Sequence, residues 1–182
     1  MAMVGLRVPP ETARLLSGIE VEGKKEDIAN FHITLLFMGS DIPIEQLAKA
    51  LGAAHSVTST TRPFPVSTSH VTCFPKGDDG VPIICPVDSD QLHDLHTKLC
   101  KSFDEAGVEY SKKHPEYKPH VTLSYADETM GDRRIPQVLW GAHEVVVWGG
   151  DSREASIMMT FPLTLDTMAA RVAARYQRGA FA

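Results

Sequence analysis

Several features that would place this chain in a common class are missing from its 182 residues. No run of about 18 apolar residues occurs, which argues against a membrane-spanning helix. Residues 1–11 lack the basic start and the long apolar segment of a secretory signal. We therefore expect a cytoplasmic protein that does not associate with membranes.

Cysteine patterns and glycine-rich phosphate-binding motifs of known classes are also missing. The three cysteines, Cys73, Cys85 and Cys100, fit no metal-binding spacing, and their odd number does not indicate a disulfide framework. We expect buried thiols. Neither G-x-G-x-x-G nor G-x-x-x-x-G-K-[ST] occurs, which argues against nucleoside triphosphate hydrolysis at a P-loop.

Basic residues are fewer than acidic residues in this chain. The chain has 18 Lys and Arg against 23 Asp and Glu, so its net charge is −5, and its pI is about 5.9. A protein that follows a long nucleic acid usually needs a basic face. This balance favours a small nucleotide, bound locally, over long RNA or DNA.

Against this background, one short pattern occurs twice. Residues 32–37 are HITLLF and residues 120–125 are HVTLSY, rich in the β-branched and aromatic residues that strands favour. Side chains alternate across a strand, so the histidine and the threonine of each copy share one face. We expect Ile33 and Leu35, and likewise Val121 and Leu123, to point into a core.

The two pairs have the chemistry of an acid–base site. One imidazole can take a proton while the other gives one, because histidine titrates near neutrality. A threonine hydroxyl beside each can donate a hydrogen bond to a phosphoryl oxygen. We therefore predict that His32, Thr34, His120 and Thr122 catalyse an in-line displacement at phosphorus, with no metal or cofactor.

These motifs resemble those of the two-histidine (2H) phosphoesterases, defined by two His-x-Thr/Ser motifs. HITLLFMG at residues 32–39 and PHVTLSY at 119–125 match the family's runs, and the resemblance covers about residues 3–165. It implies an α+β, pseudo-symmetric fold of two lobes, with antiparallel sheets flanking a central cleft and helices outside. We assign residues 1–165 to this domain and 166–182 to a C-terminal helical tail or linker, or the start of a further segment.

The resemblance also implies a substrate class. Relatives act on 2′,3′-cyclic phosphates, 2′–5′ linked oligonucleotides, RNA ends and cyclic oligonucleotide messengers, which some phage (anti-CBASS) relatives destroy to evade bacterial immunity. Many RNA-end relatives have arginine where this chain has Tyr125. We therefore expect a metal-independent phosphodiesterase of cyclic nucleotides or cyclic oligonucleotides. RNA-end processing and a non-catalytic nucleotide-binding module are the alternatives.

Further residues are candidates for binding. Tyr125 ends its strand and can stack on a base, as can Trp140, Trp148 and Tyr117, although Trp148 lies in an apolar strand that favours core packing. Lys118 has the strand parity of His120 and belongs to a basic group with Lys112, Lys113 and His114. His93 and His96 share a helix face, but they lack a third ligand, and we interpret them as exposed polar positions.

Periodicity predicts helices after Pro9, over 43–55 and over 88–106, and a polar loop over 22–30. Strands are predicted over 3–8, 32–37, 64–75, 81–87, 118–125, 144–149 and 155–165. Segregated helices and antiparallel strands indicate an α+β domain.

Overall fold

The computed structural model describes residues 1–114, 116–149 and 156–164. The elements are, in chain order, β1 (Ala2–Arg7), α1 (Pro10–Ser17), β2 (Lys24–Lys25), η1 (Ile28–Asn30), β3 (His32–Gly39), α2 (Ile44–Thr58), β4 (Phe64–Cys73), β5 (Val81–Pro86), α3 (Asp90–Ala106), β6 (His120–Ala126), β7 (Arg133–Ala142), β8 (Glu144–Gly149) and β9 (Ser156–Pro162).

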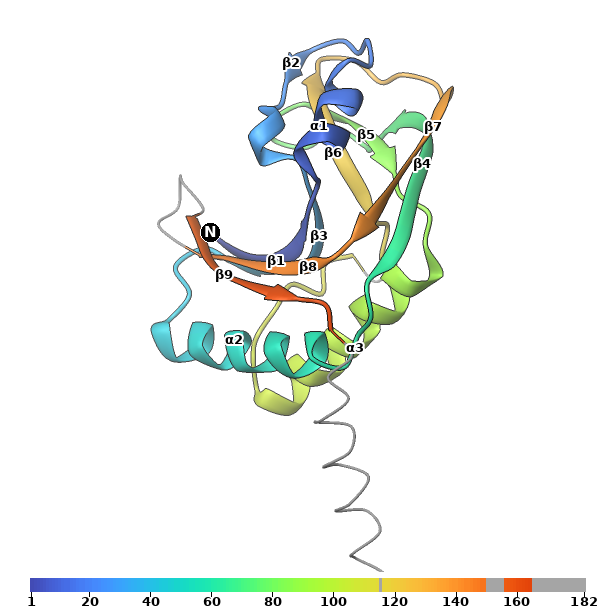
Figure 1. Ribbon diagram of the computed structural model, residues 1–182. Helices are drawn as coiled ribbons and strands as arrows, with labels where there is room; N and C mark the ends of the chain where they lie inside the picture. Colours follow the sequence, from blue (N-terminus) through green and yellow to red (C-terminus); the bar gives the residue numbers. More distant parts are fainter. Residues whose placement is uncertain (115, 150–155, 165–182) are drawn as a thin grey trace, which may run out of the picture.

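The strands form two sheets, with the orders β3-β1-β8-β9 and β2-β6-β5-β4-β7. Each named pairing is antiparallel. Figure 1 shows the first sheet curling beneath the second, with α2 and α3 below it and α1 above, beside β6. This arrangement confirms the predicted α+β fold.

The two motif strands occupy corresponding positions. β3 pairs with β1, which places His32 opposite Arg7, and β6 pairs with β5, which places His120 opposite Pro86. β3 and β6 are also in contact with each other. The fold therefore brings the two histidine motifs from separate sheets to the line where the sheets meet.

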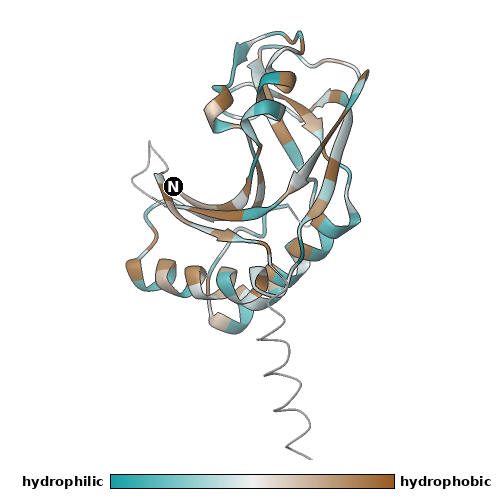
Figure 2. Ribbon diagram, viewed as in Figure 1, coloured by the Kyte–Doolittle hydropathy of each residue, from teal (hydrophilic) through white to brown (hydrophobic). Residues whose placement is uncertain are grey.

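Helix α3 illustrates how the sequence determines an element. The Ser89 hydroxyl accepts a hydrogen bond from the Leu92 amide, and Gly107 ends the helix at a φ of 65°, in the left-handed region that favours glycine. The helical repeat then buries Leu92, Leu95, Leu99 and Phe103. α3 packs on β3 and on α2, while α2 also covers β8 and β9. Figure 2 shows apolar positions along the strands and alternating along these helices.

Four elements differ from the expectation. β7 has no counterpart in the sequence prediction, because Arg133, Arg134 and Pro136 interrupt its apolar pattern. Such residues are tolerated since β7 is, among the described strands, an edge strand that pairs with β4. The expected polar loop at 22–30 contains the short elements β2 and η1, and β9 is shorter than the predicted strand.

The burial of the cysteines and of His96 agrees only in part with the expectation. Cys85 is buried, as expected, and burial raises the pKa of its thiol to about 11. Cys73 and Cys100 are half-buried rather than buried. His96 is also half-buried, because its ring stacks on Tyr117 at a centroid distance of 4.0 Å. The predicted tail at 166–182 lies outside the described residues.

None of the helices in the described part of the chain combines the length and apolar character that a membrane span needs.

Candidate functional site

A cavity of about 200 Å³ lies between the two motif strands. The side chains that line it are polar, and they come from both sheets and from the segment that precedes β3. They are Glu26, Asn30, His32, Thr34, His120, Thr122 and Tyr125. All four motif residues predicted to act together therefore surround one space.

Strand alternation places them there. Ile33, Leu35, Val121 and Leu123 are each no more than 3% exposed, which confirms that these positions point into the core. The intervening histidines and threonines are half-buried and face the opposite side of each strand. Each catalytic candidate therefore stands on a strand whose other face is fixed by packing.

Both imidazoles are oriented in the same way. Nδ1 of His32 lies 2.6 Å from the carbonyl oxygen of Asn30, and Nδ1 of His120 lies 2.7 Å from that of Lys118. A carbonyl oxygen only accepts, so Nδ1 donates in both cases. This leaves Nε2 of each ring available to a ligand in the cavity, as an acceptor when neutral and as a donor when protonated.

An aromatic ring supports each imidazole. Trp148 lies 5.6 Å from His32 between ring centroids, and Phe74 meets His120 edge-on at 4.7 Å. Burial lowers the pKa of His120, and the nearby charge of His32 lowers it further, against an opposing effect of the hydrogen bond to the Lys118 carbonyl. His120 is therefore biased toward its neutral form.

The two binding candidates differ in position. Tyr125 lines the cavity, and burial raises the pKa of its phenol, together with the charges of Glu26 and Asp79. The phenol therefore stays protonated and can donate a hydrogen bond. Lys118 does not line the cavity: its exposed ammonium pairs with Glu116 at 3.2 Å, and its carbonyl oxygen orients His120.

The other aromatic candidates are not among the residues that line the cavity. Trp140 and Trp148 are each 8% exposed, in keeping with core packing. Tyr117 packs on His96 of α3, and its hydroxyl donates to the carbonyl oxygen of Thr34, 3.2 Å away. Tyr117 therefore helps hold the strand that contains Thr34 rather than lining the cavity.

Glu26 and Asn30 are cavity residues that sequence reasoning missed. Both fall in the expected polar loop, where no periodicity assigns a direction to a side chain. Asn30 precedes the first motif by two residues, and its carbonyl oxygen holds His32. In the sequence, only the nearness of Asn30 to His32 could have pointed to the cavity, and nearness alone assigns no role to a residue.

Within the described ranges, no group of three or more His, Cys, Asp or Glu side chains is placed to hold a metal ion. His93 and His96 accordingly have no third ligand in that part of the chain. Their rings instead lie against Tyr117.

The sequence matches the 2′-5′ RNA ligase superfamily over residues 23–148. No curated protein matches the chain in sequence. Among solved structures, it is similar to TT0787 of Thermus thermophilus, with a TM-score of 0.76 and 18% identity, over 91% of this chain and 98% of that one.

Escherichia coli LigT is also similar. Its apo form aligns with a TM-score of 0.64 and 15% identity, over 90% of this chain and 96% of LigT. Its complex with 3′-AMP aligns with a TM-score of 0.65 and 17% identity, over 90% and 97%. At this identity the likeness shows a shared fold. The family match, which spans both motifs, shows more: the chain belongs to the 2′-5′ RNA ligase superfamily of two-histidine phosphoesterases.

Proposed function

We propose that this protein is a metal-independent phosphodiesterase that cleaves small nucleotides, most favourably cyclic nucleotides or cyclic oligonucleotides. The observation that supports this best is the pair of imidazoles around one cavity, each with Nδ1 bonded to a backbone carbonyl. A nucleotide-binding module would not need two histidines oriented in this way. LigT has been crystallised with 3′-AMP, ATP and NADP+, which is consistent with a small nucleotide as substrate.

In the proposed reaction, neutral His120 accepts the proton of the attacking hydroxyl or water at Nε2. The oxygen attacks phosphorus as the bond to the leaving oxygen breaks, and protonated His32 donates its Nε2 proton to that leaving oxygen. The hydroxyls of Thr34 and Thr122 donate to the non-bridging oxygens. Their hydrogen bonds strengthen as charge gathers on these oxygens.

The lowered pKa of His120 supports this assignment of roles. Before each turnover one proton is shared by the pair, and the more easily deprotonated ring is the base. When His32 is protonated, its charge further disfavours a proton on His120. The pair is therefore suited to begin each turnover with a neutral base and a charged acid.

A bell-shaped dependence of kcat/KM on pH follows. Falling pH protonates His120 and removes the base, and because the pKa of His120 lies below the ordinary histidine value of 6.5, the acidic limb should lie below pH 6.5. Rising pH deprotonates the acid and gives the alkaline limb. The check is a pH–rate profile on a cleaved substrate; an acidic limb above pH 6.5 would contradict the assignment.

A substrate screen tests the proposal itself. Purified protein is incubated with cyclic dinucleotides, cyclic trinucleotides, 2′,3′-cyclic mononucleotides and 2′–5′ oligoadenylates, and the products are separated and identified. Cleavage of a cyclic compound supports the proposal, whereas cleavage of 2′–5′ linkages alone favours RNA-type processing. Binding without cleavage would favour the non-catalytic alternative.

The same screen in excess chelator tests metal independence. Two imidazoles suffice to move both protons, so we expect the rate to be unchanged by EDTA. Loss of activity on chelation, restored by a divalent ion, would show that the proposed mechanism is incomplete.

A further inference from the structure

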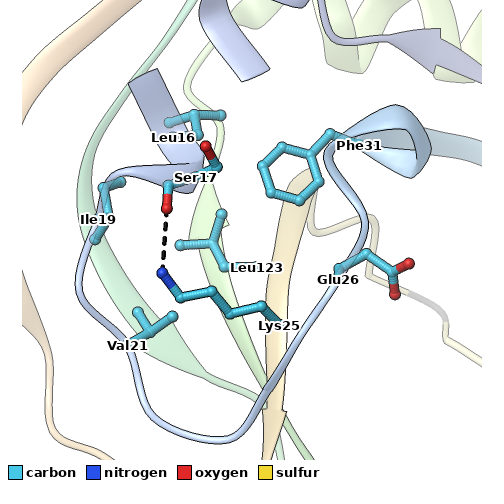
Figure 3. Close-up of a pocket in the computed structure, with 8 residues that line it drawn as sticks. All are labelled: Leu16, Ser17, Ile19, Val21, Lys25, Glu26, Phe31 and Leu123. Carbon is cyan, nitrogen blue, oxygen red and sulfur yellow. Dashed lines mark hydrogen bonds between the residues drawn. The ribbon is translucent and has the colours of Figure 1, made fainter. Parts of the chain in front are cut away.

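The cavity contains a carboxylate that the proposed mechanism does not use. Glu26 Oε1 accepts hydrogen bonds from Asn30 Nδ2 at 3.0 Å and from the Asp27 amide at 3.2 Å. Within the described residues, Oε2 has no hydrogen-bond partner. Figure 3 shows the carboxylate turned away from the small apolar pocket between α1 and β6, while the residue also lines the catalytic cavity.

The segment that bears Glu26 is held firmly. The backbone amide of Glu26 donates to the Leu123 carbonyl at 2.9 Å. The Ser124 hydroxyl donates to the Glu22 carbonyl at 2.6 Å, and Lys25 Nζ donates to the Ser17 carbonyl at 3.2 Å. Gly23 has a φ of +88°, and a Cβ there would come within 2.2 Å of the Tyr125 carbonyl oxygen. The carboxylate is therefore presented by fixed backbone beside β6.

The negative charge of Glu26 is unusual for a cavity that binds an anion. Among the lining residues that the structure describes, Glu26 is the one carboxylate, and none is Lys or Arg. Arg7, which pairs with His32 between β1 and β3, is not among the residues that line the cavity. A phosphodiester is itself an anion, and a like charge nearby is unfavourable in a partly desolvated site. The Glu26 carboxylate can lie beside a bound substrate if the substrate donates a hydrogen bond to it.

We propose that Glu26 selects the group beside the scissile phosphate: it accepts a hydrogen bond from an uncharged N–H or O–H donor of the nucleoside and repels a second phosphate. This inference rests on the proposed function and narrows its substrate class. The preferred substrate has a free hydroxyl or a base amino group at this position, and a nucleotide with a terminal phosphate there is disfavoured.

Binding of two product-like probes tests the charge filter. Adenosine 3′-monophosphate and adenosine 3′,5′-bisphosphate are titrated into the protein by calorimetry. Wild type should bind the monophosphate more tightly, and Glu26→Gln should shift the ratio of the two affinities toward the bisphosphate by about tenfold, which corresponds to 1.4 kcal/mol. Glutamine keeps an oxygen that can accept from Asn30 and Asp27, so the variant removes charge with little other change.

Glu22→Gln is the matched control. It makes the same change in net charge in the same segment, but Glu22 does not line the cavity, so the affinity ratio should stay at the wild-type value. A similar shift in both variants would indicate a general effect of net charge and would overturn the inference. An unchanged ratio in Glu26→Gln, or a wild-type preference for the bisphosphate, would also overturn it.

Three further probes distinguish the sources of the donor. The 5′-deoxy and 2′-deoxy analogues of adenosine 3′-monophosphate each lack one hydroxyl donor, and the purine riboside 3′-monophosphate lacks the amino group. We expect one of the three to lose affinity for wild type and to bind Glu26→Gln and wild type alike; if none of them loses affinity, the donor contact is refuted. If neither parent probe binds, this inference fails, whereas the proposed function fails only if the substrate screen gives no cleavage.

Discussion

Replacing His32 or His120 by alanine is expected to lower kcat by about 10²–10⁴-fold, because each change removes the group that moves one proton in the transition state. Substrate binding should change little, since the threonine hydroxyls and the rest of the cavity remain. The double variant should be little worse than either single variant, because the two groups act as a unit. The measurement is kcat and KM for each variant on a substrate identified by the screen.

The series has internal controls. His143 is exposed between β7 and β8, so His143→Ala should retain wild-type turnover. Thr34→Ala and Thr122→Ala each remove one hydrogen bond to a partly charged oxygen, which costs on the order of 1.5–3 kcal/mol, and they should lose less activity than the histidine variants. If either histidine variant turned over at near the wild-type rate, the paired mechanism would be wrong.

In the proposed mechanism, proton transfer also depends on groups that touch no substrate. The carbonyl oxygens of Asn30 and Lys118 fix Nδ1 of the two imidazoles, and the strands beneath are fixed by core side chains such as Ile33 and Val121. The main chain thus supplies the orientation that a carboxylate supplies in many other histidine sites. Side-chain substitution at Asn30 leaves its carbonyl in place, so its effect should be exerted chiefly through Glu26.

The sequence predicts the motif strands well because one physical rule governs them. Alternation in a strand puts His32 and Thr34 on one face and the apolar residues on the other, whatever the rest of the fold does. Helix α3 is predicted for a similar local reason: its apolar repeat and Gly107, which ends it, agree. In both cases the signal lies within a few neighbouring residues.

What the sequence does not reveal depends on partners far along the chain. β7 is a strand because it pairs with β4, even though Pro136 and two arginines weaken the apolar pattern of its sequence. Glu26 enters the cavity because β2 pairs with β6, about a hundred residues away in sequence. A two-residue strand has too short a pattern to detect, so this cavity residue emerges only from the folded chain.

The identity of the nucleophile leads to the second large effect. If the substrate contains a 3′–5′ linkage, the attacking group is expected to be the neighbouring 2′-hydroxyl. It is already held beside phosphorus, and such intramolecular reactions reach effective molarities of about 10⁵–10⁸ M. His120 would take the proton of this hydroxyl while His32 protonates the departing 5′-oxygen. The first product would then have a 2′,3′-cyclic phosphate on one side and a 5′-hydroxyl on the other.

A substrate whose 2′-hydroxyl is replaced by hydrogen should therefore bind but remain uncut. The 2′-methoxy analogue is the matched control: it restores the oxygen without a proton to lose, and it should be equally inert. Both are measured as competitive inhibitors of the ribose substrate, with product analysis over long incubation. Efficient cleavage of the 2′-deoxy analogue would show that water attacks directly, with His120 activating water instead; the two-histidine site would stand, but its first product would be a linear phosphate.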